Sequence, residues 1–367
     1  MRLSEFRGRD NNFNLIRMIA ALLVMEAHAC GVTRHAEPIK SLLGVGSGDL
    51  GVDIFFVLSG YLIAKSWAGK TWKEFAWARA TRIYPALWAS TLLSILVVAF
   101  FFSRGSAADF LLRPSTGAYF WHNATLLPHF GVQTNLPGAF GLANPDFNVS
   151  LWTLPYELQM YVVLALAGMV VGISGPSMGA IALTGAAIVV TARFSGSYTD
   201  QIVRGRFLYF FFSGALAFAL RDRIVLNGWL AAALALLVAT FCLIAAPAWR
   251  VVPLAISLPY LIFWCAYVPA GFLRLYNRLG DYSYGTYILA HPVQLGLYAL
   301  GLAMSWRSNM LLSMAIVLPL ACISWHALEK RALAIPLPAL FSRKVAAPAG
   351  SDDETPARAK ERASQTR

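Results

Sequence analysis

Long apolar stretches recur along the chain, and short segments between them carry most of the charged residues. A transmembrane helix needs about 17 to 25 mostly apolar residues, and stretches of about this length occur about ten times. They cover residues 13–33, 49–66, 84–103, 151–173, 178–194, 206–221, 229–246, 251–268, 282–303 and 309–328. The pattern therefore predicts an all-α protein, a polytopic transmembrane helical bundle of about ten spans.

The composition excludes an ordinary soluble domain. Hydrophobic residues make up 58% of the 367 residues and charged residues only 13%, against about a quarter charged in soluble domains. The net charge of +12 is scattered in short clusters between apolar runs, so we expect no nucleic-acid partner. The four cysteines lack the paired spacing of a zinc site, and we expect no metal.

The first apolar stretch ends in a small-residue sequence that resembles a signal-peptide cleavage site. It also carries Glu26 and His28 near its end, and its length of about 20 residues is enough to cross a membrane. We therefore expect a retained membrane helix.

Lys and Arg placement predicts the topology, because cytosolic loops are enriched in both. Arg2, Arg7 and Arg9 precede the first stretch, and further basic residues crowd the loop after the second. We expect both termini in the cytosol and a multi-pass protein of the cytoplasmic (inner) membrane. Residues 1–336 would form the transmembrane domain, and residues 337–367, rich in Pro, Ala and charge, a disordered cytosolic tail. The loop over 104–150 would lie outside, with an interfacial or re-entrant piece.

Ionisable residues inside apolar stretches are costly and indicate function. Arg17 and His28 are eleven residues apart, which is about three helical turns, so they share one stripe about 16 Å apart along the axis. Arg17 would lie near the cytosolic end and His28 in the outer half. Alternatively, Arg17 extends to the interface and His28 only packs.

Two carboxylates are expected at the depth of His28. Asp53 lies about one turn in from the outer end of its stretch, so it could meet His28 or be a simple interfacial residue. Glu157 follows Trp152 by five residues and would also lie in the outer half, where it needs a partner such as His28 or an incoming hydroxyl. Trp152 is equally well explained as an interface anchor.

Paired cations precede the third stretch. Arg79 and Arg82 are three residues apart, so on a helix they share a face and suit phosphate oxygens. Positive-inside topology alone also explains them.

Two polar groupings occur near the end of the membrane part. Tyr284, Tyr287 and His291 recur along one face of the ninth stretch, as a ligand wall or as a structural hydrogen-bonded stripe. His326 and Glu329 at the end of the tenth stretch are expected to fix helix packing or a helix end.

Taken in order, these segments resemble the membrane acyltransferase-3 family over residues 12–332. The first part of the fourth motif, from Trp152 to Glu157, is similar to the branch that modifies exopolysaccharides and nodulation-type oligosaccharides. The five motifs that carry the resemblance are Arg17 with His28, Gly51 to Ile63, Arg79 to Pro85, Trp152 to Tyr161 and Ser283 to His291.

The resemblance implies an integral membrane O-acyltransferase that moves an acyl group, with acetyl expected, from cytosolic acyl-CoA to a hydroxyl of a carbohydrate. The acceptor would be an exopolysaccharide, an O-antigen or a lipid-linked oligosaccharide, reached within the lipid bilayer, and a homo-oligomer is allowed for. Neutral His28 would remove the hydroxyl proton, which requires a pKa near working pH. The roles expected for the others are orientation by Asp53 and Glu157, CoA binding by Arg17, Arg79 and Arg82, and substrate binding by Trp152, Tyr287 and His291.

Three alternatives stay open at this point. The acyl group could pass through an acyl-His28 intermediate before reaching the alcohol. Buried His, Asp and Glu among ten spans also describe a proton-coupled secondary transporter of a small solute. The chain could also be a structural subunit of a polysaccharide assembly machine.

Overall fold

A computed structural model describes residues 1–338 except residues 7, 9, 104, 127–132, 142–145 and 195–199. Arg7 and Arg9, used above for topology, and nearly all of the predicted tail lie outside the described residues. Residues from Met1 to Ala334 form one compact unit.

The described chain is helical, with no strand among its elements. Every one of the ten predicted stretches contains a helix. These helices are α1 (Phe13–Val32), α3 (Ser47–Trp67), α4 (Trp72–Val97), α7 (Leu154–Val170), α8 (Gly175–Phe194), α9 (Asp200–Ala219), α10 (Gly228–Ile244), α11 (Pro247–Tyr267), α12 (Ser283–Ala299) and α13 (Trp306–Ser324). Shorter elements used below are α5 (Ala107–Leu111), α6 (Pro114–Thr125), the 3-10 helix η4 (Val149–Thr153) and the π-helix η6 (Trp325–Glu329).

Eight helical segments in the described part are long and apolar enough to cross a membrane. The helices α10 and α12 are shorter, with 17 residues each. Large apolar side chains face outward, such as Leu243 and Val170, which are 82% and 80% exposed. Such a surface suits lipid and not water, and the all-α polytopic bundle is confirmed.

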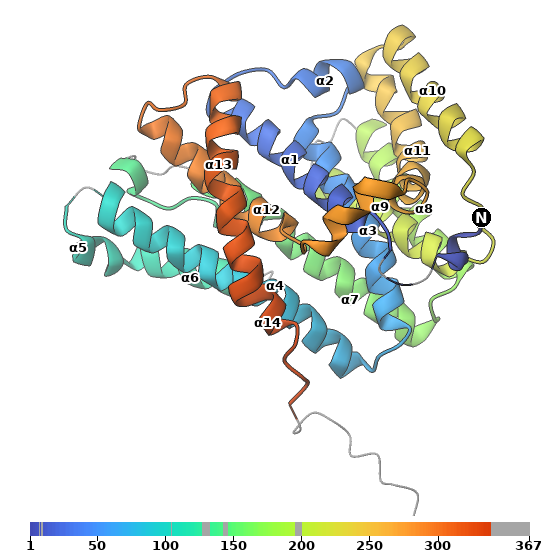
Figure 1. The fold of residues 1–367 in the computed structure, drawn as a ribbon, viewed down its shortest axis with the longest axis horizontal. Coiled ribbons are helices and arrows are strands. Elements are labelled where there is room, and N and C mark those ends of the chain that lie inside the picture. Colours follow the sequence, from blue (N-terminus) through green and yellow to red (C-terminus); the bar gives the residue numbers. More distant parts are fainter. Residues whose placement is uncertain are drawn as a thin grey trace, which may run out of the picture. The chain divides into compact units, whose positions relative to one another are not determined.

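Helix α3 occupies the centre of the bundle and is the most buried of these eight segments. It packs against α1 and α9 (Figure 1). Its contact with α9 is made by backbones, because a Cβ on Gly60 would lie 1.8 Å from the Phe211 carbonyl oxygen, and one on Gly214 would lie 2.0 Å from that of Val57. Small residues at such crossings let helices approach closely where lipid supplies no hydrophobic drive.

Helix α6 doubles back along α4, on the side of the bundle away from α10 and α11 (Figure 1). Its last carbonyls, those of Ala124 and Thr125, accept hydrogen bonds from Trp88 Nε1 at 2.8 Å and Tyr84 Oη at 3.1 Å. Both donors lie in the middle of α4, where a helix end needs side-chain partners because water is scarce.

The chain then runs inward along α12 before α7 begins. Asn148 Nδ2 donates to the Ile288 carbonyl at 3.0 Å, and the hydroxyls of Thr153 and Tyr287 are 2.6 Å apart. Tyr287 lies in the second turn of α12, so α7 starts deep inside the bundle.

The tight α3–α9 crossing predicts that Gly60→Ala destabilises the fold by about 1–3 kcal/mol, because the added Cβ meets a backbone carbonyl that cannot rotate away. The matched control is Gly117→Ala in α6, where nothing lies within 4 Å of the new Cβ and alanine should stabilise the helix slightly. Thermal melting in lipid nanodiscs measures both. Equal melting temperatures would contradict the backbone contact.

Candidate active site

Arg17 and His28 both face α12, as their shared stripe predicts. Arg17 Nε donates to Ser283 Oγ at 3.2 Å, and the rings of His28 and His291 have centroids 5.0 Å apart. The two helices therefore run in the same direction. We call the two levels of the bundle the Arg17 end and the His28 end.

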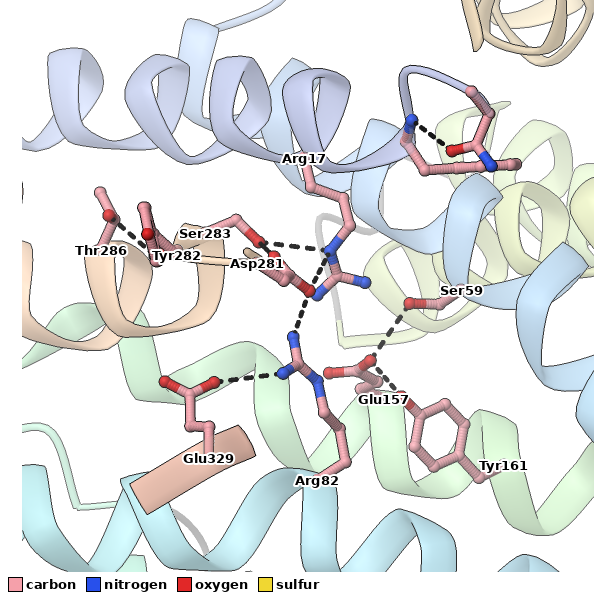
Figure 2. A network of polar contacts seen from close by, with 12 residues as sticks. Arg17, Ser59, Arg82, Glu157, Tyr161, Asp281, Tyr282, Ser283, Thr286 and Glu329 are labelled. Carbon is pink, nitrogen blue, oxygen red and sulfur yellow. Dashed lines mark hydrogen bonds and ion pairs between the residues drawn. The ribbon is translucent and has the colours of Figure 1, made fainter. Parts of the chain in front are cut away.

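A buried ion network occupies the Arg17 end (Figure 2). Arg17 Nε and Arg82 Nη2 lie 3.2 and 2.5 Å from the same Asp281 oxygen, and Arg82 Nη1 lies 3.1 Å from Glu329 Oε2. Burial by itself would raise the pKa of Asp281, but Arg17 and Arg82 outweigh it and lower that pKa to about 2. The carboxylate thus stays charged and joins α1, α4 and the start of α12, while Glu329 joins η6 to α4.

The two arginines expected to share a phosphate are not equivalent. Arg82 is neutralised by two carboxylates, whereas no described carboxylate lies within ion-pair distance of Arg79. The Arg79 guanidinium lies over the rings of Phe75 and Tyr161, at 5.9 and 6.0 Å. Its Nε is buried without a hydrogen-bond partner. Arg79 is therefore the cation left available to an anion.

An apolar cavity of about 210 Å³ lies beside Arg79, between α4, α7 and the end of α3. Its other lining residues are almost all apolar or aromatic. They are Trp67, Trp72, Phe75, Ala76, Ala80, Ile83, Tyr84, Leu158, Tyr161, Val162, Ala165 and Met169.

Glu157 lies at the level of Arg17, and the expectation that it shares the depth of His28 is wrong. It accepts a hydrogen bond from Ser59 Oγ at 3.2 Å and another from the Tyr161 hydroxyl (Figure 2). The cause is the deep start of α7. With Arg17 and Tyr287, Glu157 lines a second cavity of about 40 Å³, with room for about three waters.

Asp53 also does not meet His28. Its Oδ1 lies 2.8 Å from Arg206 Nε on α9, and Arg206 reaches Asp49 as well, at 2.6 Å. The side chain points toward α9 because α3 turns that face to its glycine-lined crossing. The ion pair of Asp53 with Arg206 therefore connects α3 to α9.

Trp152 packs its ring against Tyr156 and Phe207, with centroids 5.9 and 5.7 Å away. It lines neither of the two cavities. Its contacts are therefore those of a packing residue, and its predicted role in substrate binding stays a prediction.

The ring of His28 packs against the ring of His291. His291 is 6% exposed, and its Nδ1 lies 2.9 Å from the Phe147 carbonyl, so Nδ1 carries a proton and donates it to that oxygen. His28 keeps part of its surface accessible, while its own Nδ1 is buried without a partner. Neither cavity described above is lined by His28.

Sequence reasoning missed Asp281 and Arg206. Asp281 stands just before the Ser283 motif and could have been found as the missing counter-ion of Arg17 and Arg82. Arg206 fits the positive-inside pattern poorly, because the expected topology places it on the outer side. That exception could have indicated that Arg206 pairs with a carboxylate inside the bundle.

The family model of acyltransferase-3, an acyltransferase domain, matches residues 10–326. The chain belongs to this family. As a member of the acyltransferase-3 family with eight span-length apolar helices, it is a multi-pass membrane acyltransferase.

Curated relatives agree with this assignment. The chain is 28% identical over 348 residues to an O-acetyl transferase of Shigella phage Sf6, covering 89% of this acyltransferase and 96% of the relative. It is 29% identical to nodulation protein 10 of Rhizobium leguminosarum bv. viciae, covering 43% and 44%. It is 30% identical to the peptidoglycan O-acetyltransferase OatA of Listeria monocytogenes, covering 32% and 19%. No solved structure matches the chain.

The contacts of Asp53 predict that Asp53→Leu destabilises the acyltransferase by about 3 kcal/mol, because Arg206 loses the more buried of its two carboxylate partners. The double variant Asp53→Leu/Arg206→Leu should recover most of that loss and keep acyl transfer. Melting temperature and transfer rate in nanodiscs measure both effects, and Asp49→Asn, at a half-exposed position, is the mild control. A double variant that folds but is inactive would instead make Asp53 catalytic.

Proposed function

We propose that this acyltransferase transfers an acetyl group from cytosolic acyl-CoA to a hydroxyl of an envelope carbohydrate. The observation that carries the proposal is one available guanidinium, Arg79, beside an apolar cavity at the Arg17 end, with a partly accessible imidazole, His28, at the other end. The functions of the relatives, O-acetyl transfer and peptidoglycan O-acetylation, support the acetyl group and the carbohydrate.

The donor would enter at the Arg17 end, which we place on the cytosolic side of the inner membrane. Lys70 and Lys73 flank the start of α4 and can hold the outer phosphates of CoA, while Arg79 holds an anionic or carbonyl oxygen deeper in. The apolar cavity beside Arg79 suits the pantetheine arm.

His28 would act as the general base. As the sugar oxygen attacks the thioester carbon, the imidazole takes the hydroxyl proton, the C–S bond breaks, and the proton passes to the departing CoA sulfur. The ring of His291, held by the Phe147 carbonyl, packs edge-on against His28 and fixes its position. Direct transfer and an acyl-His28 intermediate differ in one measurable respect. Accumulation of acylated enzyme in the absence of acceptor would show the covalent intermediate, and its absence would favour direct transfer.

Loss of the base should abolish transfer. We expect His28→Ala to lower acetyl transfer by about 10²–10⁴-fold, measured as radiolabel moved from [¹⁴C]acetyl-CoA to polysaccharide in membranes of expressing cells. His35→Ala is the control, because His35 lies beyond the end of α1 and its ring hydrogen-bonds to nearby Thr33. Full transfer by His28→Ala would exclude it as the base, and solute counterflow without acetyl-CoA dependence would favour a transporter.

The two arginines should separate binding from stability. Arg79→Gln should raise the KM for acetyl-CoA by about tenfold, the loss of one charge-assisted contact, with little change in melting temperature. Arg82→Gln should lower stability by about 3–5 kcal/mol, because it leaves Glu329 without its counter-ion and Asp281 with Arg17 alone. Steady-state kinetics and thermal melting of both variants check this, and the reverse pattern would assign the donor site to Arg82.

A further inference from the structure

Buried polar atoms without partners gather around the His28 half of α12. Among the described residues, twelve buried side-chain nitrogen or oxygen atoms lack a hydrogen-bond partner. Seven of them belong to this region, which we call the α12 cluster. They are His28 Nδ1, Tyr119 Oη, Asn123 Oδ1, Asn148 Oδ1, Ser150 Oγ, Gln294 Oε1 and Asn309 Oδ1.

Backbone contacts hold the amides of the cluster in one orientation. Gln294 Nε2 donates to the Met25 carbonyl at 2.8 Å, one turn before His28 on α1. Asn309 Nδ2 donates to the Gln294 carbonyl at 3.0 Å, and Asn148 Nδ2 to the carbonyl of Ile288 at 3.0 Å. In each of these amides the NH₂ group donates to a backbone carbonyl, and the amide oxygen has no hydrogen-bond partner.

The remaining members join the same region through Phe147. Its carbonyl bonds to His291, and its ring lies 6.2 Å from that of Tyr119. Asn123 is one turn further along α6 and donates to the Tyr119 carbonyl at 2.9 Å. Ser150 follows in η4, and its side chain, like those of Asn123 and Gln294, is fully buried.

The chemistry of the cluster is that of an acceptor surface. Four of its seven atoms are amide oxygens, which can only accept, and two are hydroxyls, which can accept or donate. A buried acceptor left unpaired costs free energy, so several together call for donors. The seven residues include no Lys or Arg, so an anionic ligand would find no cation among them.

We propose that the α12 cluster binds the hydroxyl groups of a neutral carbohydrate acceptor and presents one of them to His28. The inference rests on the proposed function and deepens it by naming the acceptor class and its binding residues. A sugar ring offers several O–H donors at once, which matches four acceptor oxygens on residues bonded to the same half of the bundle as His28. Uronic acids and other acidic sugars bind poorly, because their carboxylates would meet amide oxygens.

Two variants remove a single unpartnered atom each and no existing hydrogen bond: Ser150→Ala and Tyr119→Phe. If these groups served only the fold, their removal would leave activity unchanged and melting temperature unchanged or raised. If they bind acceptor, each raises the acceptor KM about three- to tenfold, the loss of one hydrogen bond. The matched control is Ser257→Ala on α11, another fully buried serine whose Oγ has no partner.

The assay uses the full chain in nanodiscs with [¹⁴C]acetyl-CoA and four probes: chitotetraose, maltotetraose, a soluble peptidoglycan fragment and tetragalacturonate as the acidic sugar. The acceptor KM, the acetyl-CoA KM and the melting temperature with and without each oligosaccharide are measured for all variants. We expect a raised acceptor KM and a reduced melting shift for Ser150→Ala and Tyr119→Phe, an unchanged acetyl-CoA KM, and wild-type values for Ser257→Ala.

Unchanged acceptor KM values in both variants, a melting temperature that no neutral oligosaccharide shifts, or a preference for tetragalacturonate would each overturn the inference. Failure of the proposed function would look different. In that case acetyl-CoA would not be consumed by the wild type with any probe, whatever the oligosaccharides do to the melting temperature.

Discussion

The cost of burying an unpaired charge in an apolar bundle governs this structure. Asp281 sits between Arg17 and Arg82, which also reaches Glu329, so three helical segments and a loop meet at one ion network. Asp53 and Arg206 do the same between α3 and α9. Breaking either network from one side would leave a charge without water or a partner, so these side chains hold the bundle together.

Against that background, the groups left without partners are informative. Arg79 has an unpaired guanidinium nitrogen, and His28 an unpaired ring nitrogen, although most charged neighbours around them are matched. A buried polar nitrogen without a partner lowers stability. A donor that brings negative oxygens to Arg79 and an alcohol that brings a proton to His28 would give both nitrogens a hydrogen-bond partner. A transferase site is expected to form such contacts with its substrates during the reaction.

The helices and the Arg17–His28 stripe could be predicted because both depend on local periodicity, 3.6 residues per turn and a bilayer-length apolar run. The depths of Glu157 and Asp53 could not. Glu157 depends on how far the irregular chain before α7 travels inward along α12, and loop sequence does not fix that distance. The direction of Asp53 depends on α9, whose Arg206 is far away in the sequence and whose glycines set the crossing.

The separation of the carboxylates from His28 also changes the chemistry that the site can perform. A carboxylate beside a histidine stabilises the imidazolium, whereas His28 faces the ring of His291. An imidazole acts as a base in its uncharged form. Its positive charge then exists only while the alcohol attacks, and Glu157, placed near Arg17 and Arg79, is free to shape the donor end instead.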